Sequence, residues 1–236
     1  ASSSRSARPG AGAVEHSKES EPEADWAGGV YPLLQSEADE SAPERWWSAP
    51  AHEGKVRLAL LVFVATLYLP NLGSFGLWDP WETHYGAVTT HMVESYDWVS
   101  PWWGYKEKIG THKRQGNYFF SKPIFIFWSE AFFCSIFGRG ELAIRLPMAI
   151  LAMLAVLAVY LSLSKIWGRR VGVLGGVVMA TAPEFYMISR QAQTDMPFVG
   201  TMIIAMSFMM MALFAPRERV SEARFWRWIG GTFAFI

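Results

Sequence analysis

The sequence predicts an all-α, polytopic transmembrane helical protein with a long extracytoplasmic first loop that contains interfacial helices. Hydrophobic residues make up 51% of the 236 residues, and they gather in long runs after Val56 instead of being spread as in a soluble domain. Such runs are typical of membrane spans, which need about 20 apolar residues each. Lys and Arg flank the runs, as expected for segments that cross a bilayer. The formal net charge is zero, so no overall field indicates a nucleic acid partner.

Residues 1–52 are predicted to be a disordered cytoplasmic N-terminal tail. They are rich in Ser, Ala, Pro and Glu, and they cannot bury enough apolar area to offset the entropy of ordering the chain. The tail also lacks the apolar core of a signal peptide. Residues 53–236 form the membrane domain. We expect that domain to be incomplete at its C-terminus, because the chain stops at Ile236 within an apolar run.

Four spans and the start of a fifth follow the tail. Lys55 and Arg57 precede the first span, which indicates that its N-terminus is cytoplasmic. The predicted spans cover residues 56–72, 142–163, 171–188 and 196–214, and the fifth begins at residue 225.

Residues 124–137 are apolar but too short for an ordinary span, which favours an interfacial or re-entrant helix. If this segment does not span, the basic clusters after residues 163 and 214 are both cytoplasmic. If it does span, both clusters lie outside, against the positive-inside rule. The non-spanning interpretation makes the loops 73–141 and 189–195 both extracytoplasmic. Asp79 and Asp195 then share one face of the membrane.

The loop 73–141 is far longer than common connections, and loops of this length are usually functional or disordered. This loop is rich in tryptophan, so we expect a set of short helices lying along the membrane surface, including one over residues 82–95. Asp79 is a candidate N-cap of that helix, with Pro80 at the first helical position. An aromatic belt at the membrane interface is the alternative explanation for most of the tryptophans.

Four side chains near the ends of spans could carry chemistry. Asp79 and Glu82 are three residues apart and could lie on one face of a helical turn. Lys122 could bind a phosphate group or only reach the interface as a snorkelling lysine. Arg145 lies at the start of the second span and could also bind a phosphate group, or it could merely anchor the span.

No cofactor is predicted from the sequence. His84, His91 and His112 lie in the first loop, but none has a convincing metal-ligand spacing with a carboxylate, so a divalent metal stays open but unsupported. Cys134 is the one cysteine, which excludes an internal disulfide framework and a cysteine-based zinc site.

The motifs follow a recognisable order along the chain. Trp-Asp-Pro-x-Glu-x-x-Tyr stands near the end of the first span, followed by Ser-Lys-Pro, Ile-Arg-Leu-Pro, Gly-Arg-Arg, Thr-Ala-Pro and Thr-Asp-Met-Pro. This order resembles the N-terminal part of membrane glycosyltransferases of the GT-C class. The nearest branches are the protein O-mannosyltransferases and the bacterial lipid A aminoarabinose transferases. The resemblance covers about residues 56 to 215.

The resemblance implies an inverting transfer of a sugar from a polyprenyl-phosphate donor to a protein, lipid A or glycan acceptor. An acidic residue in the first outer loop would act as general base, and a cation would stabilise the departing phosphate. The enzyme would lie in the bacterial inner membrane, within the lipid bilayer, with an extracytoplasmic site. The candidate residues are Asp79, Glu82 and Asp195 for catalysis, Lys122 and Arg145 for the donor phosphate, and His84, Tyr85 and Tyr118 for acceptor contacts.

Two positions depart from the family pattern. Aligning Glu82 and Tyr85 with the family's Glu-x-x-Tyr puts Trp81 where an Asp usually stands, so either Asp79 or Glu82 would have to be the base. Ser121 occupies the position of a metal-binding Glu in the lipid A enzymes, so no metal is carried over.

A transporter or flippase of lipid-linked sugars, without transfer chemistry, is the alternative function. Such proteins also place ionisable groups near spans, but they favour broken helices and charges near the midplane. Here the acids cluster at one membrane edge under a long loop, which favours an enzyme. Nothing in the sequence supports a third interpretation, a helical assembly subunit.

Overall fold

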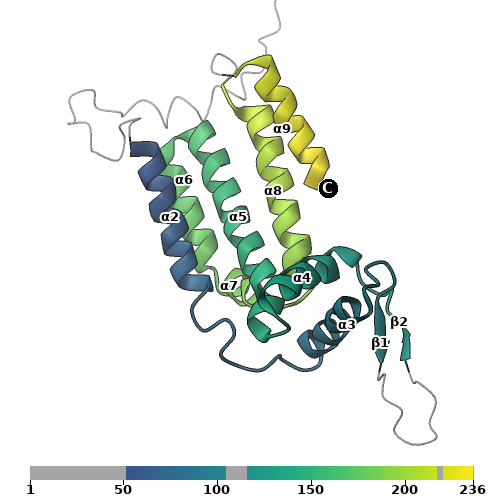
Figure 1. Ribbon diagram of the computed structural model, residues 1–236. Coiled ribbons are helices and arrows are strands. Elements are labelled where there is room, and N and C mark those ends of the chain that lie inside the picture. Colours follow the sequence, from purple (N-terminus) through teal and green to yellow (C-terminus); the bar gives the residue numbers. More distant parts are fainter. Residues whose placement is uncertain (1–51, 105–115, 217–219, 236) are drawn as a thin grey trace, which may run out of the picture. The chain divides into compact units, whose positions relative to one another are not determined.

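The computed structural model describes residues 52–104, 116–216 and 220–235, all within one compact unit (Figure 1). The predicted tail lies almost wholly outside the described residues. Six described helices are candidates for the membrane part: α2 (Glu53–Tyr68), α5 (Glu141–Trp167), α6 (Arg169–Thr181), α7 (Pro183–Ser189), α8 (Asp195–Phe214) and α9 (Glu222–Phe235).

Length and composition separate these helices into two groups. Among the described residues, α5 and α8 are each long and apolar enough to cross a membrane, and α6 with α7 passes the same test as a pair bent by 68°. The first predicted span, residues 56–72, is wrong at its end, because α2 stops at Tyr68. Pro70 explains this limit: Leu69 still donates a helical hydrogen bond to Ala65, but proline has no backbone N–H with which to continue the pattern.

The third predicted span, residues 171–188, is broken instead of continuous. Ala182 has an extended backbone with φ −60° and ψ 125°, and α7 begins at the next residue, Pro183. A proline restricts the residue before it to extended conformations and is tolerated at the first position of a new helix. The Thr-Ala-Pro motif therefore marks the bend between α6 and α7.

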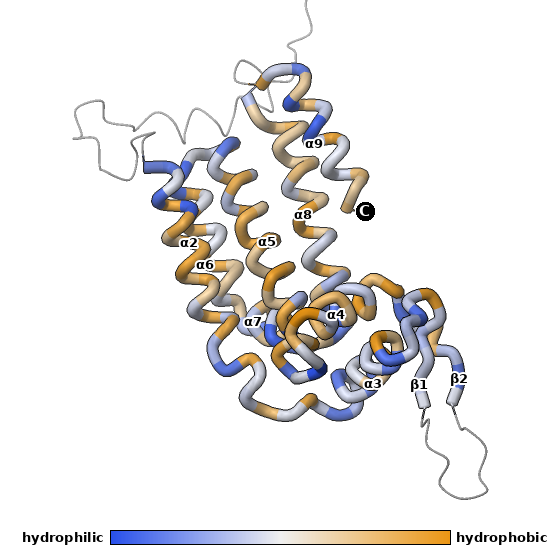
Figure 2. The backbone as a smooth tube through the Cα atoms, viewed as in Figure 1, coloured by the Kyte–Doolittle hydropathy of each residue, from blue (hydrophilic) through white to orange (hydrophobic). Residues whose placement is uncertain are grey.

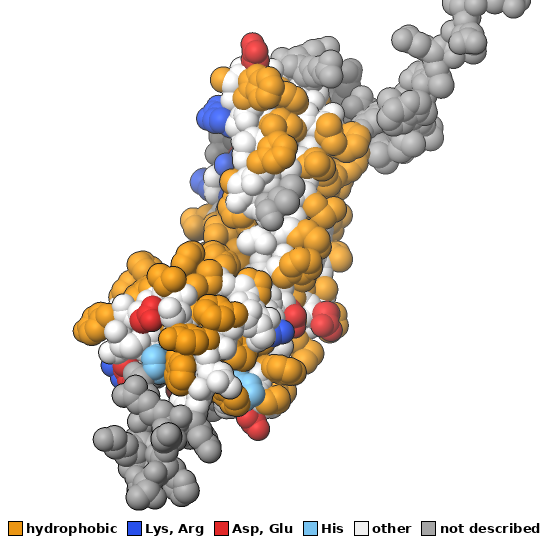
Figure 3. All heavy atoms as spheres, turned by 90° about the vertical axis from the view of Figure 1, so that its right-hand side faces the viewer, with side chains coloured by type: hydrophobic (Ala, Val, Ile, Leu, Met, Phe, Trp, Pro, Cys, Tyr) orange, Lys and Arg blue, Asp and Glu red, His pale blue; other side chains and the backbone are white. Residues whose placement is uncertain are grey.

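The long helix α5 lies at the centre of the packing, in contact with α2, α4, α6, α7 and α8. Its contact with α6 is close because α6 presents glycine there. A Cβ atom at Gly172 would lie 2.7 Å from the backbone oxygen of Tyr160. Large apolar side chains on α8, among them Phe198, Met206 and Leu213, point outward, and Figure 3 shows hydrophobic side chains along this face. An outward apolar surface suits contact with lipid or with further helices.

The described part of the loop between α2 and α5 carries two helices and a small sheet. The helices are α3 (Trp81–Ser95) and α4 (Ile124–Phe137), in agreement with the predicted segments 82–95 and 124–137. The expectation of helices alone is wrong, because β1 (Trp102–Gly104) and β2 (Gly116–Tyr118) form an antiparallel pair. Trp102 lies opposite Tyr118, and Trp103 lies opposite Asn117.

The two ends of the helices differ in character. The segments α3, α4, β1 and β2 lie together at the end where α5 and α8 begin (Figure 1). Basic residues lie at the opposite end, where α2, α6 and α9 begin and α5 finishes, and these ends are hydrophilic in Figure 2. This arrangement has the asymmetry that the positive-inside rule describes.

Candidate active site

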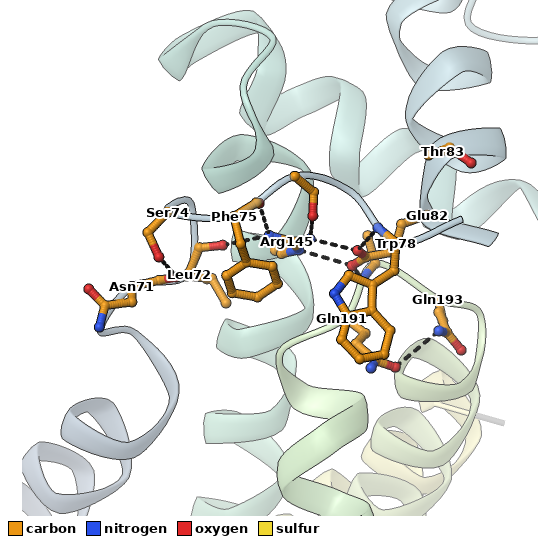
Figure 4. A network of polar contacts seen from close by, with 12 residues as sticks. Asn71, Leu72, Ser74, Phe75, Trp78, Glu82, Thr83, Arg145, Gln191 and Gln193 are labelled. Carbon is orange, nitrogen blue, oxygen red and sulfur yellow. Dashed lines mark hydrogen bonds and ion pairs between the residues drawn. The ribbon is translucent and has the colours of Figure 1, made fainter. Parts of the chain in front are cut away.

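A buried ion pair between Arg145 of α5 and Glu82 of α3 lies at the centre of the site (Figure 4). The Nη2 of Arg145 lies 2.7 Å from Oε2 of Glu82, and Nε lies 3.0 Å from Oε1. Both side chains are 0% exposed. Such a two-point contact matches the fork geometry of guanidinium to a carboxylate.

The remaining N–H groups of Arg145 bind the segment that follows α2. Nη1 donates to the carbonyls of Leu72 and Phe75 at 3.0 and 2.9 Å, and Nη2 donates to Gly76 at 2.8 Å. The Phe75 ring also covers the guanidinium, 4.0 Å from its centroid. Because a guanidinium has five donors and all are engaged, Arg145 has none left for the donor phosphate expected from the sequence.

Glu82 joins two loops as well as two helices. Its carboxylate accepts hydrogen bonds from the backbone N–H of Trp78 at 2.8 Å and of Ala192 at 2.7 Å. Burial alone would raise the pKa of Glu82, but the hydrogen bonds from Arg145, Trp78 and Ala192, with the charge of Arg145, lower it below its ordinary value. A carboxylate with a lowered pKa and no exposed surface is poorly suited to take a proton from a substrate.

Asp79 has the opposite environment, because its side chain is exposed. Its Oδ1 accepts a hydrogen bond of 2.9 Å from the hydroxyl of Thr83. The expected capping role is wrong: α3 begins at Trp81, Pro80 occupies the N-cap position, and no side chain caps the helix. The Asp79 carboxylate is thus held by one neighbour and is open to a substrate.

Lys122 lies close to the start of α3. Its Nζ is 5.8 Å from the centroid of the Trp81 ring, within the range of a cation–π contact. Since Trp81 is two residues after Asp79, the fold brings a cation from the start of α4 to the segment that carries the exposed carboxylate.

Asp195 is the exposed first residue of α8, and a firmly held loop precedes it. Ala192 donates to Glu82, and Arg190 donates to the carbonyls of Leu67 and Tyr68, at 3.0 and 2.9 Å, and of Pro70, at 2.8 Å. These contacts place the loop before Asp195 beside the loop that carries Asp79. The two loops therefore meet at one end of the helices.

Sequence reasoning missed the role of Arg190. The last carbonyls of a helix lack intrahelical partners, and a basic side chain can satisfy them. The Arg190 side chain does so for α2 from 120 or more residues away. An arginine directly after an apolar segment was a signal, but the partner could not be read from the sequence.

The three expected acceptor contacts have different environments. The ring of His84 lies 4.6 Å from that of Trp103, centroid to centroid. Tyr118 is 60% exposed beside Trp102 and Phe120. Tyr85 is 2% exposed and packs against Phe119 and Phe127, so its ring belongs to the core and does not face a substrate.

Glu130 of α4 is a buried carboxyl that sequence reasoning also missed. It is 0% exposed, and its Oε2 accepts a hydrogen bond of 2.6 Å from Thr89 of α3. Its Oε1 has no partner among the described residues. Burial raises the pKa of Glu130 to about 8, opposed by the Thr89 hydrogen bond and assisted by the charge of Glu82. The carboxyl is therefore protonated at neutral pH.

Because this carboxyl is protonated in the folded protein, we expect the stability of the fold to depend on pH. The pKa of Glu130 in the folded protein, about 8, exceeds the ordinary value of 4.5, so the unfolded chain releases a proton that the folded protein retains between these values. Stability should fall as pH rises from about 5 to 8. In Glu130→Gln this loss should be absent. The Tm of the variant should therefore rise relative to that of wild type as pH increases over that range. Parallel Tm profiles would contradict the assignment.

No group of three or more His, Cys, Asp or Glu residues that could hold a metal ion occurs in the described part of the chain. The two carboxylates differ in environment: that of Asp79 is exposed, and that of Glu82 is buried and paired with Arg145. The site as described can offer a proton acceptor and a cation to a substrate.

Comparison with known proteins identifies relatives of this chain. Residues 121–235 match the model of the dolichyl-phosphate-mannose-protein mannosyltransferase family. Undecaprenyl phosphate-alpha-4-amino-4-deoxy-L-arabinose arabinosyl transferase 2 of Pseudomonas fluorescens is 34% identical over 108 residues, which are 46% of this chain and 17% of the relative. The corresponding transferase of Pseudomonas aeruginosa is 31% identical over 108 residues, covering 46% of this chain and 18% of the relative. The chain thus spans less than a fifth of these relatives.

Two solved structures share the fold. ArnT from Cupriavidus metallidurans in the apo state matches with a TM-score of 0.66 at 23% identity, covering 78% of this chain and 32% of that chain. The same protein bound to undecaprenyl phosphate matches with a TM-score of 0.65 at 23% identity, covering 77% and 31%. The predicted fold class, an all-α polytopic transmembrane protein, is confirmed, and the chain is an integral membrane protein.

Proposed function

We propose that this chain, which belongs to the GT-C family of membrane glycosyltransferases, takes part in the transfer of a sugar from a polyprenyl-phosphate donor to an acceptor. The family and the names of the relatives support this reaction class. The names of the relatives, undecaprenyl phosphate-alpha-4-amino-4-deoxy-L-arabinose arabinosyl transferases, favour an amino sugar as the group transferred. We propose lipid A as the acceptor because the order of the motifs resembles the lipid A enzymes. A flippase without transfer chemistry has no comparable support.

The observation that carries the proposal is the exposed Asp79 carboxylate beside a buried scaffold. We assign Asp79 as the general base, since it is open to substrate while Glu82 is fully buried and paired. Glu82 and Arg145 are positioning residues that hold the segment carrying Asp79. Asp195, the first residue of α8 after the adjoining loop, orients the acceptor.

The reaction proceeds by a single displacement in this account. Asp79 takes the proton of the acceptor hydroxyl, whose oxygen attacks the anomeric carbon of the sugar. The bond between that carbon and the phosphate oxygen breaks, and the electron pair leaves with the polyprenyl phosphate. Lys122 stabilises the negative charge on the departing phosphate, because its ammonium group acts as a point charge beside the phosphate oxygens. His84 and Tyr118 remain candidate acceptor contacts.

The orientation in the membrane is part of the proposal. Basic residues flank the ends of the helices away from Asp79, and such residues favour the cytoplasmic side. The site would then face the extracytoplasmic side of the bacterial inner membrane. Interfacial α4, with exposed Phe125, Trp128 and Phe132, would lie along the surface of that leaflet.

Sugar transfer by the reconstituted full-length protein tests the function directly. Vesicles are supplied with undecaprenyl-phosphate aminoarabinose and lipid A, and the product is followed by mass spectrometry. We expect transfer to acceptor on the extracytoplasmic face alone. Movement of the donor across the bilayer without any product would overturn the proposal and favour the flippase.

The role of Lys122 gives a second expected result. Lys122→Gln should raise the KM for the donor and lower kcat by about tenfold or more, because a fixed cation near the developing phosphate charge is lost. Lys165→Gln, at the far end of α5, is the matched control and should leave transfer unchanged. Equal activity of Lys122→Gln and wild type would remove Lys122 from the site.

A further inference from the structure

A groove of about 740 Å³ lies between α2 and α6, at the end of these helices that lies away from α3. Its walls are apolar, and its lining residues in the described part of the chain come from these two helices. They are Val56, Ala59, Leu60 and Phe63 of α2 and Val173, Leu174 and Val177 of α6, with Lys55, Arg169 and Arg170 at the same end. In Figure 2 the hydrophilic ends of α2 and α6 and the apolar turns that follow are seen side by side.

Three cations stand at the mouth of the groove. Lys55 and Arg170 are exposed, and Arg169 is half-buried. The neighbouring acid of α2, Glu53, forms an ion pair with Arg57 in the same helix, so it does not neutralise Lys55 directly. The exposed Lys55 and Arg170 therefore present positive charge to a ligand.

The apolar walls continue well into the helices. Phe63 is eight residues beyond Lys55, which is about 12 Å along an α-helix. The side chain of Leu174 is 64% exposed. At the inner wall the helices approach closely, since a Cβ atom at Gly176 would lie 3.1 Å from Leu60. Glycine at this position therefore lets α6 pass close to Leu60, one of the lining residues.

We propose that this groove binds an anionic phospholipid, with its phosphate at Lys55 and Arg170 and an acyl chain along the walls. Basic pockets between membrane helices at the cytoplasmic side suit acidic headgroups. An apolar channel directly beneath the cations suits the first part of an acyl chain. A zwitterionic phospholipid fits less well, because its own ammonium group would meet the cations. The assignment to the cytoplasmic leaflet rests on the proposed orientation, and the binding site itself does not depend on sugar transfer.

Native mass spectrometry of the full-length protein tests the headgroup contact. The protein is released from micelles that contain equal amounts of phosphatidylglycerol and phosphatidylcholine. Wild type should retain phosphatidylglycerol preferentially, and the double variant Lys55→Gln/Arg170→Gln should lose most of this preference, roughly fivefold per cation removed. The control Arg224→Gln/Arg227→Gln removes two charges of α9, outside the groove, and should retain the preference. Equal loss in both variants would overturn the proposal.

A second pair of variants tests the apolar walls. Ala59→Trp fills the groove and should reduce retention of phosphatidylglycerol, while Val178→Trp, on an exposed position of α6 outside the lining, should not. Undecaprenyl phosphate is added as a competitor. Displacement of phosphatidylglycerol by an equal amount of undecaprenyl phosphate would overturn the phospholipid assignment. So would the absence of any retained lipid in wild type, as expected if a further helix of the protein fills the groove.

Discussion

Replacing Arg145 with methionine is expected to lower the free energy of unfolding by about 3–5 kcal/mol, since it leaves the buried Glu82 carboxylate without its cationic partner. The variant also removes the donors to the carbonyls of Leu72, Phe75 and Gly76. These losses act together, because one guanidinium joins α3, α5 and the segment after α2. Denaturant unfolding of the purified protein in detergent measures the change.

A matched surface pair provides the control. Arg139 and Glu94 form an ion pair at 2.6 Å, almost the same distance as the 2.7 Å between Arg145 and Glu82, but both side chains are substantially exposed. Arg139→Met should therefore cost about 0–1 kcal/mol. Similar costs for Arg145→Met and Arg139→Met would contradict a scaffold role for the buried pair.

The double variant Arg145→Met/Glu82→Met separates the buried charge from the lost hydrogen bonds. It should be more stable than Arg145→Met alone, because no unpaired charge remains inside the protein. The carbonyls of Leu72, Phe75 and Gly76 would still lack their donor, so stability should not return to that of wild type.

Asp79→Asn is expected to lower kcat by about 10²–10⁴-fold, the usual contribution of a positioned general base. Tm should stay within the error of wild type, because the exposed side chain makes a single hydrogen bond, which an amide oxygen can still accept from Thr83. Initial rates of sugar transfer, measured with saturating donor and acceptor, give the result.

Glu94→Gln serves as the control for Asp79→Asn. It removes an exposed acid from the same loop, at the far end of α3, and should leave kcat unchanged. If both variants lose activity to the same extent, the loss comes from removing negative charge from the loop and not from removing a base at Asp79.

The sequence predicts elements well where the cause is local. The helix at Ile124–Phe137 has the predicted bounds, since its apolar run begins after Pro123 and is followed by Gly138, with φ +86°. The break before Pro183 was also encoded locally, but the hydrophobic run concealed it. The short pair β1 and β2 was missed, because three residues in each strand give no periodic signal.

The site was less predictable, because its contacts join residues distant in sequence. Arg145 and Glu82 are 63 residues apart, and both were expected to face a substrate. A buried arginine at the start of an apolar helix requires a partner, but the sequence does not say which acid supplies it. Glu130 was overlooked for a similar reason, since α4 is apolar on every side and its acid is buried against Thr89.

Parallel measurement of kcat and Tm in Asp79→Asn and Glu82→Gln tests the central claim, that the exposed acid is the base and the buried acid is the scaffold. The account predicts a large loss of kcat with an unchanged Tm for Asp79→Asn, and a clearly lowered Tm for Glu82→Gln, because Arg145 loses its charged partner. Full activity of Asp79→Asn, together with an inactive Glu82→Gln of native Tm, would contradict it and make Glu82 the base.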